Sequence, residues 1–218
     1  LEEERDSVVP GLVHRYPDRV LMLVTDICPM FCRHCTRKRE WRRGRWVRPP
    51  QEIDRMIAYI RNDPRIRDVI ISGGDPLTLS TRHLEDILKK IRDIPHVEII
   101  RIGSRVPVVL PQRIDDELCD MLSRLGPIWL NTHFNHANEL TDEAKAACEK
   151  ILRRGIPVNN QSVLLAGVND SVENQLKLCH GLLRAKIRPY YLFQADEVDG
   201  TEHLRTTVEK GLSIIEGM

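Results

Sequence analysis

Neither sign of charge dominates this sequence, which holds 33 lysines and arginines against 32 aspartates and glutamates. A chain so close to neutral creates no global field that would draw it to nucleic acid or to a membrane surface. The sequence also lacks an apolar run of about 18 residues and a signal-peptide pattern. These absences predict no membrane contact.

Cysteine is scarce, with six residues in a chain of 218. Six cysteines in a chain of this length are too few for a disulfide scaffold and favour a reducing, cytoplasmic location. Three of them nevertheless gather within eight positions, at Cys28, Cys32 and Cys35. A concentration of thiols in an otherwise cysteine-poor chain indicates a metal or redox site.

Short apolar runs alternate along the chain with longer amphipathic segments. The runs have the apolar density of buried parallel strands and span residues 20–26, 67–73, 97–103, 127–134, 156–165 and 187–194. The amphipathic segments have helical periodicity and span residues 50–62, 80–93, 114–125, 141–155 and 170–186. Helix-start signals stand at Ser80, Thr141 and Asp170, and Gly155 closes one segment. Six β-then-α units with no linker between them predict one α/β domain built on a parallel sheet.

A parallel sheet of this kind places its chemistry just beyond the carboxyl ends of its strands. Candidate residues follow every predicted strand: the cysteine loop, "SGGDPL", "GSR", "THFNH", Gln161 near the end of the fifth strand, and "QAD". Because these strand ends meet at one edge of the sheet, we expect a single active-site rim to which six strands contribute.

The Cys-x3-Cys-x2-Cys spacing of residues 28–35 presents three thiols on one loop. A structural zinc site takes four ligands, and the only further donor inside the motif is His34. Cys119, Cys148 and Cys179 fall in helical patterns, where a free cysteine usually acts as a small hydrophobe. A 4Fe–4S cluster has four corners, so three thiolates leave one iron open to a second molecule. The sequence favours the cluster and leaves zinc as the alternative.

The motif "CPMFCRHC" resembles the signature of radical S-adenosylmethionine enzymes. In that superfamily the methionine moiety of S-adenosylmethionine chelates the fourth iron, and the reduced cluster cleaves the molecule to a 5′-deoxyadenosyl radical. "SGGDPL" is similar to the superfamily's Gly-Gly-acid stretch, which receives the methionine amino group. Glycines permit close approach to the main chain, and a carboxylate suits an ammonium. The resemblance implies S-adenosylmethionine binding by rim residues His34, Ser72, Gly73, Gly74, Asp75, His133 and Gln161.

Longer stretches are similar, in order and spacing, to the lysine 2,3-aminomutase family: "HRYPDRVLMLVTDICPMFCRHCTRKR", "RIGSRVPVVLPQRI", "WLNTHFNH", "NNQSVLLAGVND" and "RPYYLFQAD". This resemblance implies a partial (β/α)6 TIM-like barrel that uses a 4Fe–4S cluster, S-adenosylmethionine and pyridoxal phosphate. It also implies that pyridoxal phosphate lies near Arg15, Tyr16 and Arg19. Arg37 would take the substrate carboxylate, and Asp196 would hold the side-chain ammonium of the substrate.

The reaction implied by the resemblance is an isomerisation. The α-amino group of L-lysine would move to Cβ through a pyridoxal phosphate aldimine and the 5′-deoxyadenosyl radical. The negative charge of Asp196 favours lysine, and arginine, glutamate and a protein-bound lysine are the alternative substrates. The resemblance further implies a small-molecule amino acid as partner and an electron donor such as flavodoxin or ferredoxin, and it leaves room for a homo-oligomer.

The same resemblance divides the chain into two parts. Residues 1–19 form an N-terminal segment that contributes to the cofactor site, and residues 20–218 form the barrel core. The sequence starts at Leu1 and stops at "IIEGM", which resembles the end of a helix. The family's Schiff-base lysine lies in a glycine-rich segment after the sixth unit. We therefore expect a piece of a longer protein, with that lysine beyond Met218.

The basic run "RKREWRRGRWVR", residues 37–48, supports a different interpretation. It holds seven basic residues with Trp41 and Trp46 between them, a pattern that could clamp single-stranded nucleic acid. The near neutrality of the whole chain disfavours nucleic acid as a partner. A non-catalytic zinc or nucleic-acid-binding module remains the alternative of another class.

Overall fold

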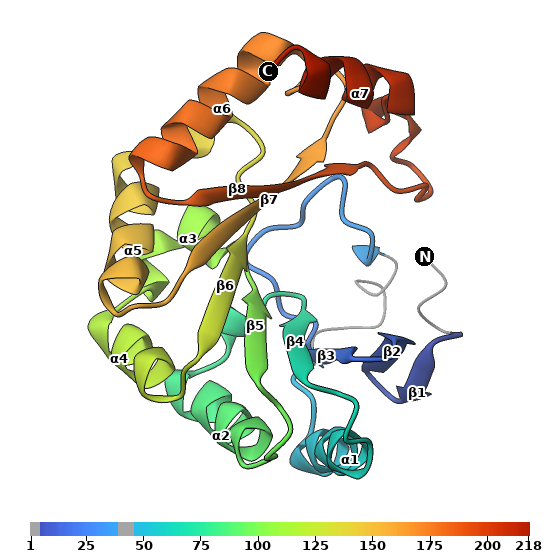
Figure 1. Ribbon diagram of the computed structural model, residues 1–218, viewed down its shortest axis with the longest axis vertical. Helices are drawn as coiled ribbons and strands as arrows, with labels where there is room; N and C mark the ends of the chain where they lie inside the picture. The colour runs from blue at the N-terminus through green and yellow to red at the C-terminus, as the bar shows by residue number, and fades with distance from the viewer. Residues whose placement is uncertain (1–4, 39–45) are drawn as a thin grey trace.

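The computed structural model describes residues 5–38 and 46–218, and these form one eight-stranded sheet whose strand order follows the chain (Figure 1). The strands are β1 (Ser7–Val9), β2 (Leu12–Tyr16), β3 (Arg19–Thr25), β4 (Asp68–Gly73), β5 (Ile99–Gly103), β6 (Ile128–Thr132), β7 (Val158–Leu164) and β8 (Arg188–Gln194). β3 to β8 are parallel, and β1 and β2 add an antiparallel hairpin beside β3. The six predicted strands are confirmed. The hairpin lies in the predicted N-terminal segment and was not expected.

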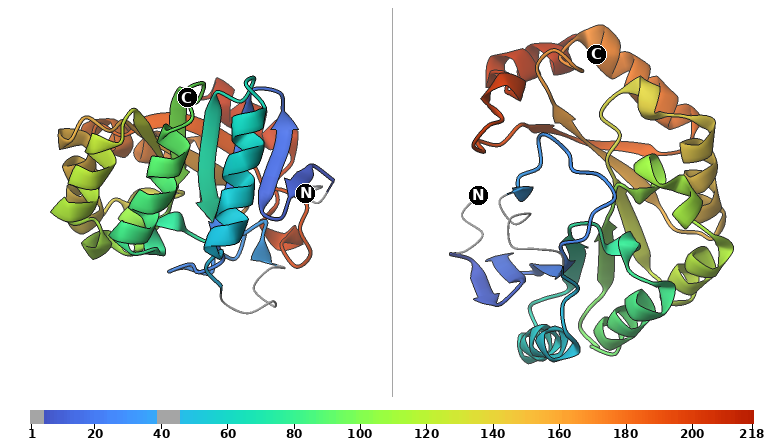
Figure 2. Two further views of the ribbon diagram at one scale, coloured as in Figure 1. Left: turned by 90° about the horizontal axis from the view of Figure 1, so that it is seen from below. Right: turned by 180° about the vertical axis from the view of Figure 1, so that it is seen from behind.

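Helices connect the parallel strands and cover the outer face of the sheet (Figure 2). They are α1 (Pro50–Asn62), α2 (Thr81–Arg92), α3 (Val106–Val109), α4 (Asp116–Arg124), α5 (Asp142–Arg153), α6 (Val172–Arg184) and α7 (Val208–Glu216). Short 3-10 turns lie at η2 (Pro76–Thr78), η3 (Pro111–Arg113), η4 (Ala137–Glu139) and η5 (Glu202–Leu204). The five predicted helices correspond to α1, α2, α4, α5 and α6.

The helix ends follow the capping residues of the sequence, with one correction. Ser80 and Thr141 accept the N–H groups of residues 83 and 144 and so cap α2 and α5. The predicted start signal Asp170 is wrong, because Ser171 is the residue whose side chain caps α6. A serine hydroxyl and an aspartate carboxylate are both good caps, so the sequence alone did not distinguish these neighbours. Gly155 follows α5 with a φ of 75°, as a terminating glycine does.

The core lies between the outer face of the sheet and the helices. Along β7 the fully buried Val158 and Leu164 alternate with the less buried Gln161 and Val163. This period of two sends one set of side chains to the helices and the other to the inside of the barrel. The inner face therefore carries polar residues, including the register partners Asn131 and Asn159, which share a 3.1 Å amide hydrogen bond.

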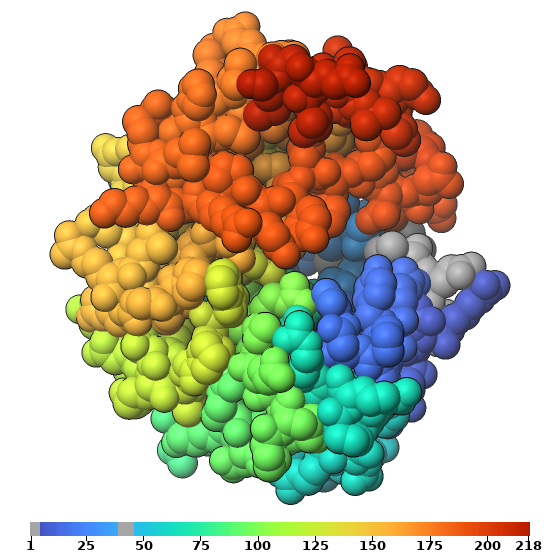
Figure 3. Space-filling model, viewed as in Figure 1, coloured from blue at the N-terminus to red at the C-terminus, as the bar shows by residue number. Residues whose placement is uncertain are grey.

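Among the described residues strand pairing does not close the barrel, because β1 and β8 are the two ends of the strand order. In the space-filling view a hollow separates the orange residues around β8 from the blue N-terminal strands (Figure 3). The predicted partial (β/α)6 TIM-like barrel is confirmed. None of the helices in the described ranges has the length and apolarity that a bilayer crossing needs.

Candidate active site

The loop that follows β3 carries the three motif cysteines, all half-buried, at the carboxyl end of the sheet. The Cys28 sulfur lies 2.9 Å from the main-chain oxygen of Met30, and the Cys32 sulfur lies 3.9 Å from the same oxygen. The Cys35 N–H donates to the Cys32 carbonyl over 3.0 Å, which turns the chain back on itself. Burial raises the pKa of the Cys28 thiol to about 11, so a metal that binds there displaces a proton.

Gly73 and Gly74 seat the start of the cysteine loop on the end of β4. The N–H of Gly74 donates to the Thr25 oxygen over 2.6 Å, and the N–H of Asp75 donates to the Ile27 oxygen over 2.8 Å. A Cβ on Gly73 would stand 2.1 Å from the Thr25 oxygen, and one on Gly74 would stand 2.4 Å from the Ile27 oxygen. The observed role of these glycines is therefore to admit the cysteine loop. Their predicted role, close approach of a ligand, stays a prediction.

Asp75 is 2% exposed and joins the loops that follow β4 and β5. Its Oδ1 accepts hydrogen bonds from the Leu77 N–H (3.1 Å) and the Ser104 hydroxyl (2.7 Å). Its Oδ2 accepts the N–H of Arg105 over 2.7 Å. Burial raises the pKa of this carboxyl to about 6, although the hydrogen bonds oppose the rise. Both oxygens are thus engaged by the chain itself, and contact of Asp75 with the ammonium of S-adenosylmethionine stays a prediction.

Arg105 extends this connection to two more loops. Its Nη1 lies 2.9 Å from the sulfur of Cys32, and its Nε donates to the His133 carbonyl over 3.1 Å. Its Nη2 is paired with the carboxylate of Glu139. The sequence placed "GSR" on the rim without a role for the arginine. The position of Arg105 just after a predicted parallel strand was the only feature of the sequence that indicated a place in the site.

The predicted histidines His34 and His133 lie close to Arg105, and Gln161 contacts His133. Burial, followed by the charges of Arg105 and His34, lowers the pKa of His133 to about 4, although a hydrogen bond with the Gln161 main chain opposes the shift. Burial and then Arg105 also lower the pKa of His34. Both imidazoles are therefore neutral at neutral pH. The structure brings His34, His133 and Gln161 to one place on the rim, and Ser72 lies half-buried at the end of β4.

The cysteine loop fits an iron–sulfur cluster better than a single metal ion. Within residues 5–38 and 46–218, no three side chains of His, Cys, Asp or Glu stand close enough to hold one ion, and this includes the cysteines with His34. A tetrahedral zinc site needs such convergence. A cluster binds each thiolate at a separate corner iron, so its protein ligands stand further apart than those of a single ion. Iron–sulfur clusters are also usually bound by cysteine thiolates alone.

The residues predicted for pyridoxal phosphate lie at the opposite end of β3 from the cysteine loop. Tyr16 and Arg19 are register partners at the β2–β3 turn, and Tyr16 is 59% exposed. Arg15 donates a hydrogen bond to the Asp6 carboxylate (2.6 Å), and Arg19 donates one to the Asp18 carboxylate (2.9 Å). The structure therefore does not bring this set together with the rim residues. Their contact with the cofactor stays a prediction.

The predicted substrate residues belong to the two loops that face each other across the opening of the barrel. Arg37 is half-buried at the end of the cysteine loop, and Asp196 is exposed in the segment after β8. The cysteine loop touches that segment through Arg33 and His203, whose nitrogens lie 3.2 Å apart. The loop after β3 thus reaches the loop after β8 even though strands β1 and β8 do not pair.

Most of the basic run at residues 37–48, including Trp41, lies outside the described residues. At its described end, Arg48 packs on the Trp46 ring with 4.3 Å to the centroid. The same guanidinium donates to the Leu23 carbonyl over 2.8 Å and pairs with Glu52. These contacts are made within the protein, so this end of the run does not present a free clamp for nucleic acid.

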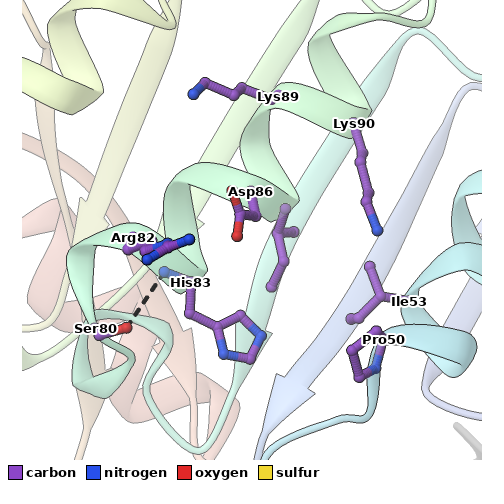
Figure 4. Close-up of a pocket in the computed structure, with 9 residues that line it drawn as sticks. Pro50, Ile53, Ser80, Arg82, His83, Asp86, Lys89 and Lys90 are labelled. Atoms are coloured by element: carbon purple, nitrogen blue, oxygen red, sulfur yellow. Dashed lines mark hydrogen bonds between the residues drawn. The ribbon is translucent and has the colours of Figure 1, made fainter.

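A second hollow lies on the outside of the barrel between α1 and α2 (Figure 4). Its volume is about 530 Å³, and its lining includes Pro50, His83 and Lys90. Lys90 is paired with Asp54 over 2.6 Å, so part of the local positive charge is neutralised. The hollow is separate from the rim and none of the predicted site residues lines it.

A partial parallel barrel whose first rim loop carries three thiols defines a class of protein, the barrel enzymes of the radical S-adenosylmethionine type. The model of the Radical SAM superfamily matches residues 22–179, and the chain belongs to this superfamily. The predicted 4Fe–4S cluster and S-adenosylmethionine follow from this membership. Streptococcus suis SuiB, a solved structure, shares the fold with a TM-score of 0.68 and 14% identity over 92% of this chain and 45% of its own.

The chain is also similar in sequence to curated aminomutases. It is 57% identical over its full length to the L-lysine 2,3-aminomutase of Fusobacterium nucleatum subsp. nucleatum, of which it covers 51%. It is 44% identical over 98% of its length to the glutamate 2,3-aminomutase of Clostridioides difficile, of which it also covers 51%. The predicted resemblance to the lysine 2,3-aminomutase family is confirmed. The chain spans about half the length of these relatives.

Proposed function

We propose that this chain forms the cluster-binding and S-adenosylmethionine-binding barrel of an aminomutase that moves the α-amino group of L-lysine to Cβ. The observation that carries the proposal is the seating of the cysteine loop on Gly73 and Gly74, with His34, His133 and Gln161 beside it. The similarity over the whole chain to lysine 2,3-aminomutases supports the choice of reaction.

In this proposal Cys28, Cys32 and Cys35 hold the cluster, and the neutral side chains of His133 and Gln161 face the nucleoside. When bound, the cluster and S-adenosylmethionine supply a carbon-centred radical, and pyridoxal phosphate carries the amino group. The chain's own contribution is positional. It fixes the reacting groups against one C–H bond and keeps water and other hydrogen donors away. Neutral imidazoles suit this task because they offer hydrogen bonds without adding charge beside the nucleoside.

Lysine is the substrate favoured by charge. Arg37 would take the carboxylate, and Asp196 would attract the distant ammonium and repel a distant carboxylate. Glutamate is the second candidate because the Clostridioides difficile relative is a glutamate 2,3-aminomutase. A flavodoxin-like or ferredoxin-like protein would supply the electron, and assembly into a homo-oligomer is compatible with the proposal.

The first experiment uses the chain as it stands. After anaerobic reconstitution with iron and sulfide, the 218-residue chain should bind about four irons, absorb near 400 nm, and release methionine and 5′-deoxyadenosine from S-adenosylmethionine on addition of dithionite. A colourless chain that releases neither product under these conditions would show that the cluster assignment is wrong.

The second experiment addresses the substrate. In a chimera, residues 1–218 replace the aligned segment of the Fusobacterium nucleatum enzyme, to which they are 57% identical. The chimera should convert lysine to its β-amino isomer faster than it converts glutamate. Faster turnover of glutamate would contradict the lysine assignment and leave the aminomutase assignment standing.

A further inference from the structure

All three nitrogens of the Arg105 guanidinium have a partner, and the partners come from different rim loops. Nε donates to the His133 carbonyl (3.1 Å), Nη1 lies 2.9 Å from the Cys32 sulfur, and Nη2 pairs with Glu139. The side chain is only 13% exposed. A planar guanidinium held at three points has little freedom to turn away from any one of them.

The groups that hold Arg105 are themselves fixed. The main-chain N–H of Arg105 donates to the buried carboxylate of Asp75 over 2.7 Å. The other oxygen of Glu139 accepts the N–H groups of Asn135 (2.5 Å) and His136 (3.2 Å) at the start of η4. The position of the guanidinium is thus set by the sheet and the η4 turn, independently of the cysteine loop that it touches.

The contact with Arg105 favours one charge state of the Cys32 sulfur. A guanidinium carries only donors and a permanent positive charge, so it favours a sulfur that bears negative charge over a neutral thiol. Arg105 faces one carboxylate, that of Glu139, and the Cys32 sulfur is its remaining side-chain partner among the described residues. The Cys28 sulfur contacts the Met30 carbonyl instead.

We propose that Arg105 is a positioning residue for the cluster, which orients the Cys32 sulfur and raises the reduction potential of the cluster that the three cysteines hold. The proposal rests on the cluster assignment made above and assigns a role to an arginine that has none in the sequence-based predictions. Reduction adds one negative charge to the cluster, and a fixed positive charge with a hydrogen bond to a ligating sulfur stabilises the reduced form. Electron transfer from the cluster is what starts the reaction, so the residue acts on its first step.

The test is a redox titration of the reconstituted 218-residue chain without S-adenosylmethionine, followed by electron paramagnetic resonance of the reduced cluster. In Arg105→Gln the charge is lost but a donor amide remains. At the midpoint potential of the parent, the ratio of reduced to oxidised cluster should fall about tenfold, which corresponds to about 59 mV for a one-electron couple. Arg105→Lys keeps the charge without the fork and should lie between the two.

Arg113→Gln is the matched control. Arg113 is also a largely buried rim arginine, with 18% of its side chain exposed, and it donates to the Leu79 carbonyl (3.0 Å) and the Thr81 hydroxyl (3.2 Å). It touches none of the motif cysteines. Its substitution should leave the iron content, the potential and the resonance spectrum of the parent unchanged.

The outcomes are distinguishable. If the parent chain takes up no cluster, the proposed function fails and the role of Arg105 fails with it. If the parent forms a cluster and the Arg105 and Arg113 variants share its potential, the role of Arg105 is wrong and the proposed function stands. If Arg105→Gln takes up less iron than the parent and Arg113→Gln does not, the positioning role is supported. The reduction potential of Arg105→Lys then tests the effect on the cluster: a value below that of the parent supports this effect, and an unchanged value contradicts it.

Discussion

The hydroxyl of Ser104 donates a 2.7 Å hydrogen bond to the carboxylate of Asp75, and two consecutive rim loops are joined by this contact. The first prediction concerns Asp75→Asn. An amide presents one acceptor oxygen in place of two, so at least one of the donors Leu77, Ser104 and Arg105 loses its partner in a buried place. We expect the free energy of unfolding to fall by about 1–3 kcal/mol.

Urea unfolding of the parent and the variant measures this, with the exposed Asp86→Asn as a control that should change stability little. Unchanged stability of Asp75→Asn together with weaker S-adenosylmethionine binding would instead indicate that the carboxylate acts on the ligand directly. The two roles of Asp75 are separated by this pair of measurements.

The second prediction concerns the glycines that seat the cysteine loop. Gly74→Ala places a methyl group 2.4 Å from the main-chain oxygen of Ile27. Moving main-chain atoms to relieve this clash should lower the free energy of unfolding by about 1–3 kcal/mol or more. The variant should be less stable and should retain less iron after reconstitution. Gly103→Ala is the control, because its Cβ meets nothing closer than 3.7 Å. Equal iron content in the two variants would argue against the seating role of Gly74.

The third prediction concerns the thiols. Replacing Cys28, Cys32 or Cys35 with alanine should remove most of the bound iron and all cleavage of S-adenosylmethionine, because each thiolate holds one corner of the cluster. Cys179→Ala is the control, since this cysteine is half-buried on α6, away from the rim. Iron analysis and product chromatography provide the readouts. A Cys32→Ala chain with full iron and full cleavage would refute the assignment.

The fourth prediction is a pH dependence that originates at His133. Its pKa in the folded chain is about 4, against an ordinary value of 6.5. Below pH 6.5 the unfolded chain binds a proton that the folded chain does not, so stability is present above pH 6.5 and is lost as the pH falls towards 4. Between pH 7.5 and 5 the parent should lose about 2 kcal/mol from this group.

His133→Gln should remove that loss, and the exposed His180→Gln should not. Urea unfolding at pH 7.5, 6 and 5 measures the difference between the variants. The raised pKa of Asp75 acts in the opposite direction, since its folded form holds a proton more tightly than the unfolded form. It is common to all three chains, so it cancels in the comparison. Parallel curves for the parent and His133→Gln would mean that this imidazole is not the source.

The fifth prediction concerns Asp196. Because this carboxylate is exposed in the segment after β8, its attraction for a lysine ammonium is screened and contributes about 0.2–1 kcal/mol. In the chimera, Asp196→Asn should raise the KM for lysine by up to about fivefold with little change in kcat. Asp199→Asn, a neighbouring exposed acid, should have a smaller effect. Identical KM values for the parent and Asp196→Asn would leave the residue without a role in substrate choice.

The sequence predicted those parts of the fold that repeat a simple physical pattern. Short, dense apolar runs such as residues 67–73 favour buried strands, and their alternation with longer helical segments predicts the parallel sheet. The hairpin of β1 and β2 escaped prediction because its strands are short and its buried residues Leu12 and Val13 are adjacent, so they show no alternating apolar pattern. The sequence did not distinguish Ser171 from Asp170 as the N-cap of α6, because serine and aspartate are both good capping residues.

For the site, the sequence identified residues by chemical type and by position after a strand. That was enough to collect the cysteines, His133 and Gln161 on one rim. It was not enough for Arg105, whose partner Cys32 lies 73 residues away, because a contact of that range is set by the three-dimensional fold. It also could not reveal that the Asp75 carboxylate is already engaged by neighbouring loops, since its three donors are two main-chain N–H groups and a serine hydroxyl.

The attachment of the cysteine loop to Gly73 and Gly74 has a consequence for the order of assembly. Small zinc domains are unfolded until the metal arrives, because their ligands are positioned by the metal alone. Here the segment from Thr25 to Ile27 is tied to the end of β4 by main-chain hydrogen bonds. The location of the first thiol is thereby determined by the sheet. The polypeptide should therefore fold first and receive iron and sulfide afterwards, and mature chains should survive removal and return of the cluster without being unfolded.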